Sequence, residues 1–170
     1  FIDKVAQEYP TPIYIYDEKS IVDKADYIDS VMSSAGVNEF RNYFAVKALP
    51  NPRILSILAD KGMGADCSSL AELEIARMVG LKGEDIMFTS NNTTLEEFRA
   101  AQDLDAIINF DDISLVQPFL NDVGVPNVAC CRFNPGDITF EGLNESIIGR
   151  PSDAKYGMNR SQIVEAYKQL

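Results

Sequence analysis

Residues 43–50 read YFAVKALP, an apolar run that ends in one lysine just before a proline-marked break. A charged residue at the end of a run that is otherwise typical of a buried strand needs a physical reason. A lysine that is partly removed from water is a good nucleophile toward a carbonyl carbon and can form a Schiff base. Lys47 is therefore the first candidate functional residue of the chain.

Similar apolar runs recur along the chain at a constant interval. They begin at residues 43, 64, 85, 106 and 127, so that each starts 21 residues after the one before. A helical pattern follows each of the first four runs, and Asn51, Ser69, Thr94 and Asp112 are the predicted residues that open these helices. Strands that alternate with helices in this way predict parallel βα units.

Polar residues gather where the predicted strands give way to loops. The strand ends carry Lys47 and the polar residues of 66–69, 89–92, 109–112 and 132–134. In a (β/α)8 barrel the active site lies at this carboxyl-terminal face, and an open doubly wound sheet also binds its ligand there. Periodicity alone does not separate the two folds. The chain has no G-x-G-x-x-G or Walker A sequence, which counts against the nucleotide-binding version.

The first residues of the chain differ from the regular units. Residues 11–17 predict a strand with an early proline, and Ser20 predicts the cap of a helix that continues to about Ser33. We expect residues 1–35 to be an N-terminal strand and helix that lead into the barrel, and residues 36–170 to be the N-terminal part of the barrel itself. A further helical pattern covers residues 161–170.

Composition excludes several classes of function. The net charge is −11, from 26 acidic and 15 basic residues, which argues against a nucleic-acid partner. No apolar run has the length of a membrane span, and no signal peptide is visible. The three cysteines predict buried, reduced thiols in a cytoplasmic protein, without metal-like spacing. Because the sequence has no histidine, a Ser-His-Asp or Cys-His mechanism within this chain is excluded.

Taken together, the motifs at the strand ends resemble those of the fold type III PLP-dependent decarboxylases, and the diaminopimelate decarboxylase branch is the most similar. In chain order the matching motifs are residues 11–17 (TPIYIYD), 43–48 (YFAVKA), 64–73 (GADCSSLAEL), 90–92 (SNN), 108–112 (INFDD), 131–136 (CRFNPG) and 154–158 (AKYGM). Each motif alone is weakly specific, whereas the ordered series covers nearly the whole chain. Asn92 departs from the lysine that is usual at its position.

The resemblance implies a role for several of these residues. Lys47 would bind pyridoxal 5'-phosphate as a Schiff base, with Asp66 and Arg132 near it and near the hydroxyl side of the cofactor. Ser69 would be a cofactor contact, although the residues themselves favour a helix cap. Glu72 fits the same capping box. The implied fold is an α/β (β/α)8 TIM-type barrel of the alanine racemase-like kind, incomplete here with about five βα units.

The implied reaction is the PLP-dependent decarboxylation of meso-2,6-diaminopimelate to L-lysine with release of CO2. Other hypotheses about the function stay open. They are an ornithine, arginine or carboxynorspermidine decarboxylase, an alanine racemase, a Schiff-base aldolase without PLP, and a non-catalytic PLP-binding relative. We expect the chain to be the N-terminal part of a longer enzyme, because a barrel needs eight strands. The full-length protein is expected to be a cytoplasmic homodimer that acts on a small amino acid, with no metal.

Overall fold

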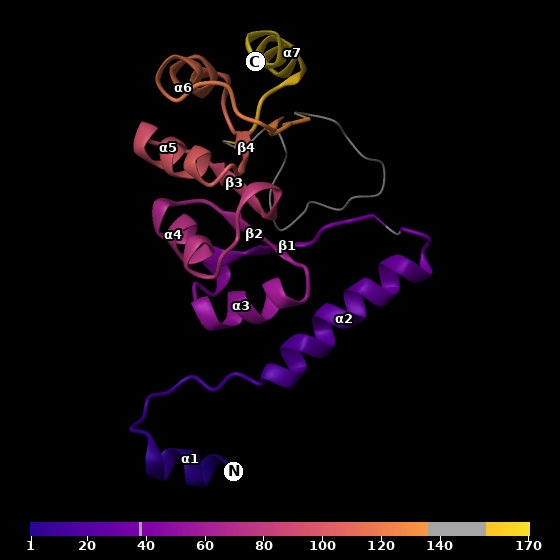
Figure 1. The fold of residues 1–170 in the computed structure, drawn as a ribbon, viewed down its shortest axis with the longest axis vertical. Helices are drawn as coiled ribbons and strands as arrows, with labels where there is room; N and C mark the ends of the chain where they lie inside the picture. The colour runs from indigo at the N-terminus through magenta and orange to yellow at the C-terminus, as the bar shows by residue number, and fades with distance from the viewer. Residues whose placement is uncertain (38, 136–155) are drawn as a thin grey trace. The chain divides into compact units, whose positions relative to one another are not determined.

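The computed structural model describes residues 1–37, 39–135 and 156–170 (Figure 1). Its residues form two compact units, Phe1–Asn38 and Glu39–Leu170. The first unit contains two helices, and the second contains the sheet and the remaining helices. No helix in the described ranges is both long enough and apolar enough to cross a membrane.

The N-terminal unit consists of α1 (Ile2–Glu8) and α2 (Glu18–Ser34), joined by an extended segment. The predicted strand at residues 11–17 is wrong, because this segment pairs with no other strand of the described chain. Its Tyr14 side chain is 88% exposed. The predicted cap at Ser20 is also wrong: Asp17 caps α2, and its carboxylate accepts both the backbone N–H and the hydroxyl of Ser20.

The second unit is built on a parallel sheet of five strands, and their order in the sheet equals their order in the sequence. The strands are β1 (Tyr43–Ala45), β2 (Gly64–Cys67), β3 (Ile86–Ser90), β4 (Ile107–Phe110) and β5 (Ala129–Cys131). This order confirms the predicted βα units. A doubly wound sheet reverses its strand order at a switch point, whereas a barrel adds each strand beside the last. The part of the sheet described here follows the barrel pattern.

The helices begin close to the predicted caps. They are α3 (Pro52–Asp60), α4 (Leu70–Met78), α5 (Leu95–Asp103), α6 (Val116–Asp122) and α7 (Arg160–Gln169). Asn51, Ser69 and Thr94 each accept backbone N–H groups of the helix that follows, as predicted. Asp112 caps a short 3-10 turn, η3 (Ile113–Leu115), and α6 starts directly after that turn.

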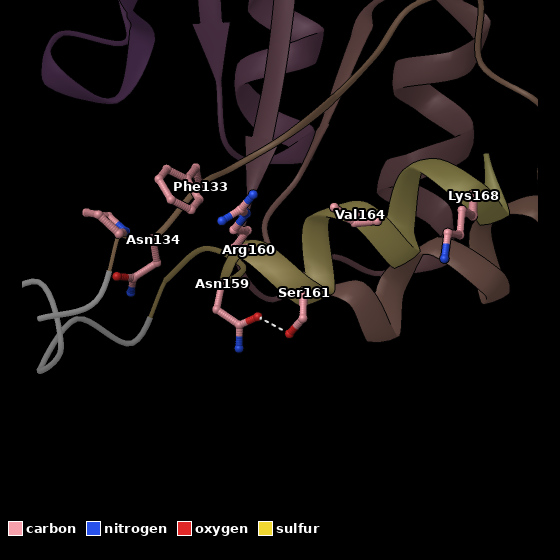
Figure 2. A pocket seen from close by; sticks show the side chains of 8 residues that line it. Phe133, Asn134, Asn159, Arg160, Ser161, Val164 and Lys168 are labelled. Carbon is pink, nitrogen blue, oxygen red and sulfur yellow. Dashed lines mark hydrogen bonds between the residues drawn. The ribbon is translucent and has the colours of Figure 1, made fainter. Parts of the chain in front are cut away.

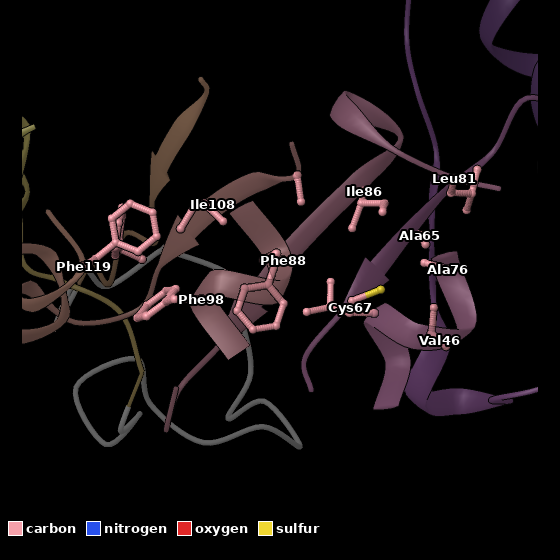
Figure 3. Packing of buried hydrophobic residues seen from close by; sticks show 14 of the residues in the cluster. Val46, Ala65, Cys67, Ala76, Leu81, Ile86, Phe88, Phe98, Ile108 and Phe119 are labelled. Atoms are coloured by element: carbon pink, nitrogen blue, oxygen red, sulfur yellow. The ribbon is translucent and has the colours of Figure 1, made fainter. Parts of the chain in front are cut away.

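The hydrophobic core lies between the sheet and the helices that Figure 1 shows along one side of it, α3 to α6. Its centre is a group of four phenylalanines, Phe88, Phe98, Phe110 and Phe119, with ring centroids 5.0–6.2 Å apart. Edge-to-face packing of this kind stabilises a core beyond the area that it buries. Figure 3 shows how the cluster continues from Phe119 to Val46 at the other end of the sheet.

Candidate functional site

The face of the sheet opposite the core carries polar side chains. Successive side chains of a strand point to opposite faces. Asp66 and Asn109 each stand between two core residues of their strands, and Thr89 follows Phe88 of the core. All three polar residues are half-buried, and Asn109 Nδ2 donates a hydrogen bond to Thr89 Oγ1 at 3.1 Å. We call Asp66, Thr89 and Asn109 the polar face.

Lys47 lies two residues after the end of β1, in the 3-10 turn η1 (Val46–Ala48). The prediction that Lys47 closes the strand is wrong by two residues, because the chain turns at Val46, whose carbonyl accepts the N–H of Leu49 at 3.1 Å. Val46 is 1% exposed and packs in the core, whereas Lys47 is exposed. The turn therefore buries the Val46 side chain in the core and leaves the Lys47 side chain exposed near the carboxyl end of β1.

Asp66 lies on β2 and pairs in register with Ala45, two residues before Lys47. Burial raises the pKa of the Asp66 carboxyl, and the negative charge of Glu72 adds to this rise. The positive charges of Lys47 and Arg132 oppose it and are too weak to cancel it. The structure thus brings both Lys47 and Arg132 within electrostatic reach of Asp66, although the three residues are far apart in the sequence.

Arg132 follows β5 directly. Its Nη1 donates to Oδ1 of Asp111 at 3.0 Å, and its guanidinium lies 5.1 Å from the ring centroid of Tyr156. The Asp111 side chain is 5% exposed and that of Arg132 is 45% exposed. The pair therefore joins a buried carboxylate to a cation that still reaches the surface.

Ser69 and Glu72 close the loop after β2. Ser69 Oγ accepts the N–H of Glu72 at 3.4 Å, which confirms the predicted cap. Glu72 accepts the N–H of Ser68 at 2.8 Å and the hydroxyls of both serines at 3.1–3.2 Å, so its back-bond reaches one residue further than in a standard capping box. The Ser69 hydroxyl thus already forms hydrogen bonds with the backbone and side chain of Glu72 in α4. Its contact with a cofactor stays a prediction.

Sequence reasoning missed several residues of this region. Asp111 was seen only as part of a strand-end motif, and its pairing with Arg132 joins β4 to the residue after β5. Thr89 and Asn109 belong to the polar strand ends 89–92 and 109–112 that the sequence indicates, but the hydrogen bond between them is visible only in the structure. The contact of Tyr156 with Arg132 has no local signal in the sequence, because it spans 24 positions. The motif residues Gly136, Ala154 and Lys155 lie outside the described residues.

A surface hollow of about 810 Å³ lies next to this region, at the start of α7 (Figure 2). Its walls are Phe133, Asn134, Pro135, Asn159, Arg160, Ser161, Val164 and Lys168. Figure 2 marks the hydrogen bond that the Ser161 hydroxyl donates to Asn159 at 2.7 Å. None of Lys47, Asp66 and Arg132 lines this hollow. We therefore place the candidate site at the polar face and the turn that carries Lys47.

The donor set at this place fits pyridoxal phosphate in its chemistry. The cofactor needs a reachable amine for its aldehyde, and the exposed Lys47 provides one. Its polar ring substituents need charged or hydrogen-bonding groups, which Asp66 and the half-exposed Arg132 supply. In the described part of the chain, no group of three His, Cys, Asp or Glu residues is placed to hold a metal ion.

Comparison with known proteins gives a consistent result. The family described as pyridoxal-dependent decarboxylase, pyridoxal binding domain, matches residues 19–170. Protein TabA of Pseudomonas amygdali pv. tabaci is 37% identical over 168 residues, which cover 99% of this chain and 38% of that protein. Diaminopimelate decarboxylase of Zymomonas mobilis subsp. mobilis is 28% identical over 173 residues, with 99% and 41% covered.

The solved structures agree with this match. The crystal structure of diaminopimelate decarboxylase from M. jannaschi superimposes with a TM-score of 0.85 and 25% identity, covering 97% of this chain and 40% of that one. The chain thus spans 38% and 41% of the length of the two curated relatives named above. With a family match over residues 19–170 and a fold that superimposes on a solved diaminopimelate decarboxylase, this chain belongs to the pyridoxal-dependent decarboxylases and carries residues of their pyridoxal-binding domain.

Proposed function

We propose that Lys47 is the residue that binds pyridoxal phosphate, and that the full-length protein decarboxylates an amino acid. The observation that supports this most is the place of Lys47: it is exposed in the turn that follows β1, and its charge acts on the half-buried Asp66 of β2. The first candidate reaction is the conversion of meso-2,6-diaminopimelate to L-lysine and CO2. A cytoplasmic location and a homodimeric state of the full-length enzyme stay predictions.

Each residue would have a separate task. Bound pyridoxal phosphate supplies the electron sink for the charge left at the substrate carbon when CO2 leaves. Lys47 would hold the cofactor covalently through Nζ and, when released by the substrate, would carry a proton on that atom. Asp66 would stabilise the protonated Nζ, because a carboxylate near an ammonium favours its charged form. Arg132 would donate hydrogen bonds to the hydroxyl side of the cofactor.

A second candidate differs only in the substrate. The identity to Protein TabA is 37%, against 28% to the diaminopimelate decarboxylase of Z. mobilis. This difference favours testing other amino acids as well, and ornithine, arginine and carboxynorspermidine are the first choices. An alanine racemase and a non-catalytic PLP-binding relative would keep the same lysine, and assays for racemisation and for CO2 release separate them from a decarboxylase.

The test uses the full-length protein that contains these residues. It is incubated with pyridoxal phosphate, reduced with borohydride and digested, and the pyridoxyl group is mapped by mass spectrometry. We expect the label on Lys47 and its absence in a Lys47→Arg variant, which keeps the positive charge. Release of CO2 is then compared between meso-2,6-diaminopimelate and the other amino acids. A folded protein that carries no label on Lys47 would refute the proposal.

A further inference from the structure

Arg132 is held by its backbone on two sides. Its N–H donates to the carbonyl of Phe110 at 2.9 Å, which is the last hydrogen bond of the pairing between β4 and β5. Its carbonyl accepts the N–H of Met158 at 2.7 Å. Because both backbone groups are used, the place where the Arg132 side chain leaves the sheet is fixed.

The residues around Met158 form a second layer against this segment. Asn134 donates its backbone N–H to the carbonyl of Met158 at 2.8 Å and its side-chain amide to the carbonyl of Tyr156 at 2.9 Å. Gly157 lies between them with φ +87, and a Cβ there would come within 3.2 Å of the Arg132 carbonyl oxygen. Residues 156–158 are thus bound along residues 132–134, and this places the Tyr156 ring beside Arg132.

The guanidinium is held by two different interactions. Asp111 accepts from Nη1 at 3.0 Å and is 4% exposed as a residue. A carboxylate this deeply buried is costly without a charged partner, so the pairing is strongly favoured over an open arrangement. The Tyr156 ring lies 5.1 Å from the guanidinium carbon, within the range of a cation–π interaction. Only one of the five N–H donors of the arginine is needed for Asp111.

We propose that Asp111 and Tyr156 are positioning residues, which orient Arg132 so that its other N–H donors meet the ligand at the polar face. The inference rests on the proposed function, since the ligand in question is pyridoxal phosphate or its adduct with the substrate. It assigns residues 156–158 a role within the same chain, as the layer that keeps Arg132 in place. Arg132 contacts the ligand, and Asp111 and Tyr156 act through Arg132.

The first experiment measures the orientation of Arg132 without any cofactor. The cofactor-free full-length protein is treated with phenylglyoxal, which modifies arginine, and the rate at Arg132 is followed by peptide mass spectrometry. We expect Asp111→Asn and Tyr156→Leu to raise this rate by about tenfold and severalfold, respectively, because each frees the guanidinium from one restraint. Asp112→Asn is the control: it removes a neighbouring charge, and asparagine still caps η3. Unchanged rates at Arg132 in both test variants would overturn the proposal.

The second experiment measures the effect on the ligand. The dissociation constant of pyridoxal phosphate, and kcat and KM separately, are determined for Arg132→Gln, Asp111→Asn and the double variant. If Asp111 acts through Arg132, Asp111→Asn weakens cofactor binding by about tenfold in the native background and adds little in the Arg132→Gln background. Equal losses in both backgrounds would show a purely structural role and would overturn the proposal.

One further variant, Tyr156→Phe, keeps the test decisive if Asp111→Asn does not fold. Asp111 is buried, and Asp111→Asn can fail to fold, whereas Tyr156 is 43% exposed and tolerates substitution more easily. Tyr156→Phe keeps the ring and should restore the cofactor affinity that Tyr156→Leu loses; absence of this rescue contradicts the role of the ring. If the native protein gives no pyridoxyl label on Lys47, the proposed function fails, and the phenylglyoxal result still decides whether Arg132 is positioned by these residues.

Discussion

The two faces of the sheet differ in chemistry along its central strands, β2 to β4. On the face covered by α3 to α6, Phe88 and Phe110 are at most 1% exposed and pack with other apolar side chains. On the other face, Asp66, Thr89 and Asn109 are half-buried and polar, with Lys47 at the edge. Polar side chains that are partly exposed in this way can form hydrogen bonds with a ligand, whereas the apolar side chains of the first face stabilise the fold by packing together.

Alternation along each strand separates the residues that stabilise the fold from those that are open to a ligand. In β4, Ile108 and Phe110 are fully buried in the core, and Asn109 between them faces the other way. A single strand therefore supplies both the packing and a polar group, and substitutions one residue apart should have different consequences.

Replacing Lys47 should abolish function while leaving the fold intact. For Lys47→Ala in the full-length protein, we expect decarboxylation to fall by at least about 10²–10⁴-fold, the range for a lost proton-transferring group. The side chain is exposed, so the melting temperature of the cofactor-free protein should hardly change. Lys82→Ala is the control, since Lys82 is also exposed and precedes β3 at the other end of the strands. Substantial activity in Lys47→Ala would place the cofactor lysine elsewhere.

The cysteines report the two faces directly. Burial raises the pKa of the Cys67 thiol, on the core side of β2, to about 12. At pH 8 only about one Cys67 in ten thousand is then a thiolate, which is the reactive form. Cys130, half-buried between two residues that pack on the core, should be alkylated by iodoacetamide long before Cys67. Mass spectrometry of the folded and urea-unfolded protein checks this, and early labelling of Cys67 would contradict the packing.

Truncation of a core phenylalanine should cost stability without touching the chemistry. Phe110 is 0% exposed and lies 5.2 Å from Phe119 between ring centroids. Phe110→Ala should lower the free energy of unfolding by about 3–5 kcal/mol, through lost burial and the cavity left behind. Phe133→Ala is the matched control, because that ring is 53% exposed and its loss should change stability by less than about 0.5 kcal/mol. Urea unfolding measures both, and similar losses would mean that the core is misassigned.

Much of this fold follows from local signals in the sequence. The 21-residue spacing predicts all five strands, and the helix starts at Asn51, Ser69 and Thr94 follow from short polar side chains that accept nearby N–H groups. The prediction of a strand at residues 11–17 is wrong because it rests on their alternating apolar residues alone. Such alternation is typical of a strand, but a strand forms only where a neighbouring strand pairs with it. Pairing is a property of the folded chain, and no partner strand is present among the described residues.

The site was predictable in part for the same reason. Lys47, Asp66 and Arg132 are charged residues at strand ends, where parallel strands bring their carboxyl ends to one side. The ion pair between Asp111 and Arg132 joins residues 21 positions apart in the sequence. The contact between the Tyr156 ring and the Arg132 guanidinium joins residues 24 positions apart. No local pattern encodes such contacts. The family motifs mark where these residues are, and the structure adds which of them touch.

Replacing Asp66, the half-buried carboxylate of the polar face, should change the stability of the protein only slightly. Because burial raises its pKa in the folded chain, ionised Asp66 costs stability at pH values above its folded pKa. Asp66→Asn should therefore raise the free energy of unfolding at pH 7. The increase should be less than about 1 kcal/mol, because the side chain is only half-buried and the charges of Lys47 and Arg132 offset part of the cost of burial. As the pH falls below the ordinary aspartate value of 3.8, native Asp66 becomes protonated in both states and the advantage of the variant should disappear. Urea unfolding of the cofactor-free protein between pH 3 and 8 measures this difference, with the exposed Asp60→Asn as control. If Asp66→Asn is less stable than the native protein at pH 7, the charges of Lys47 and Arg132 outweigh burial, and their attraction to Asp66 stabilises the fold even before a ligand binds.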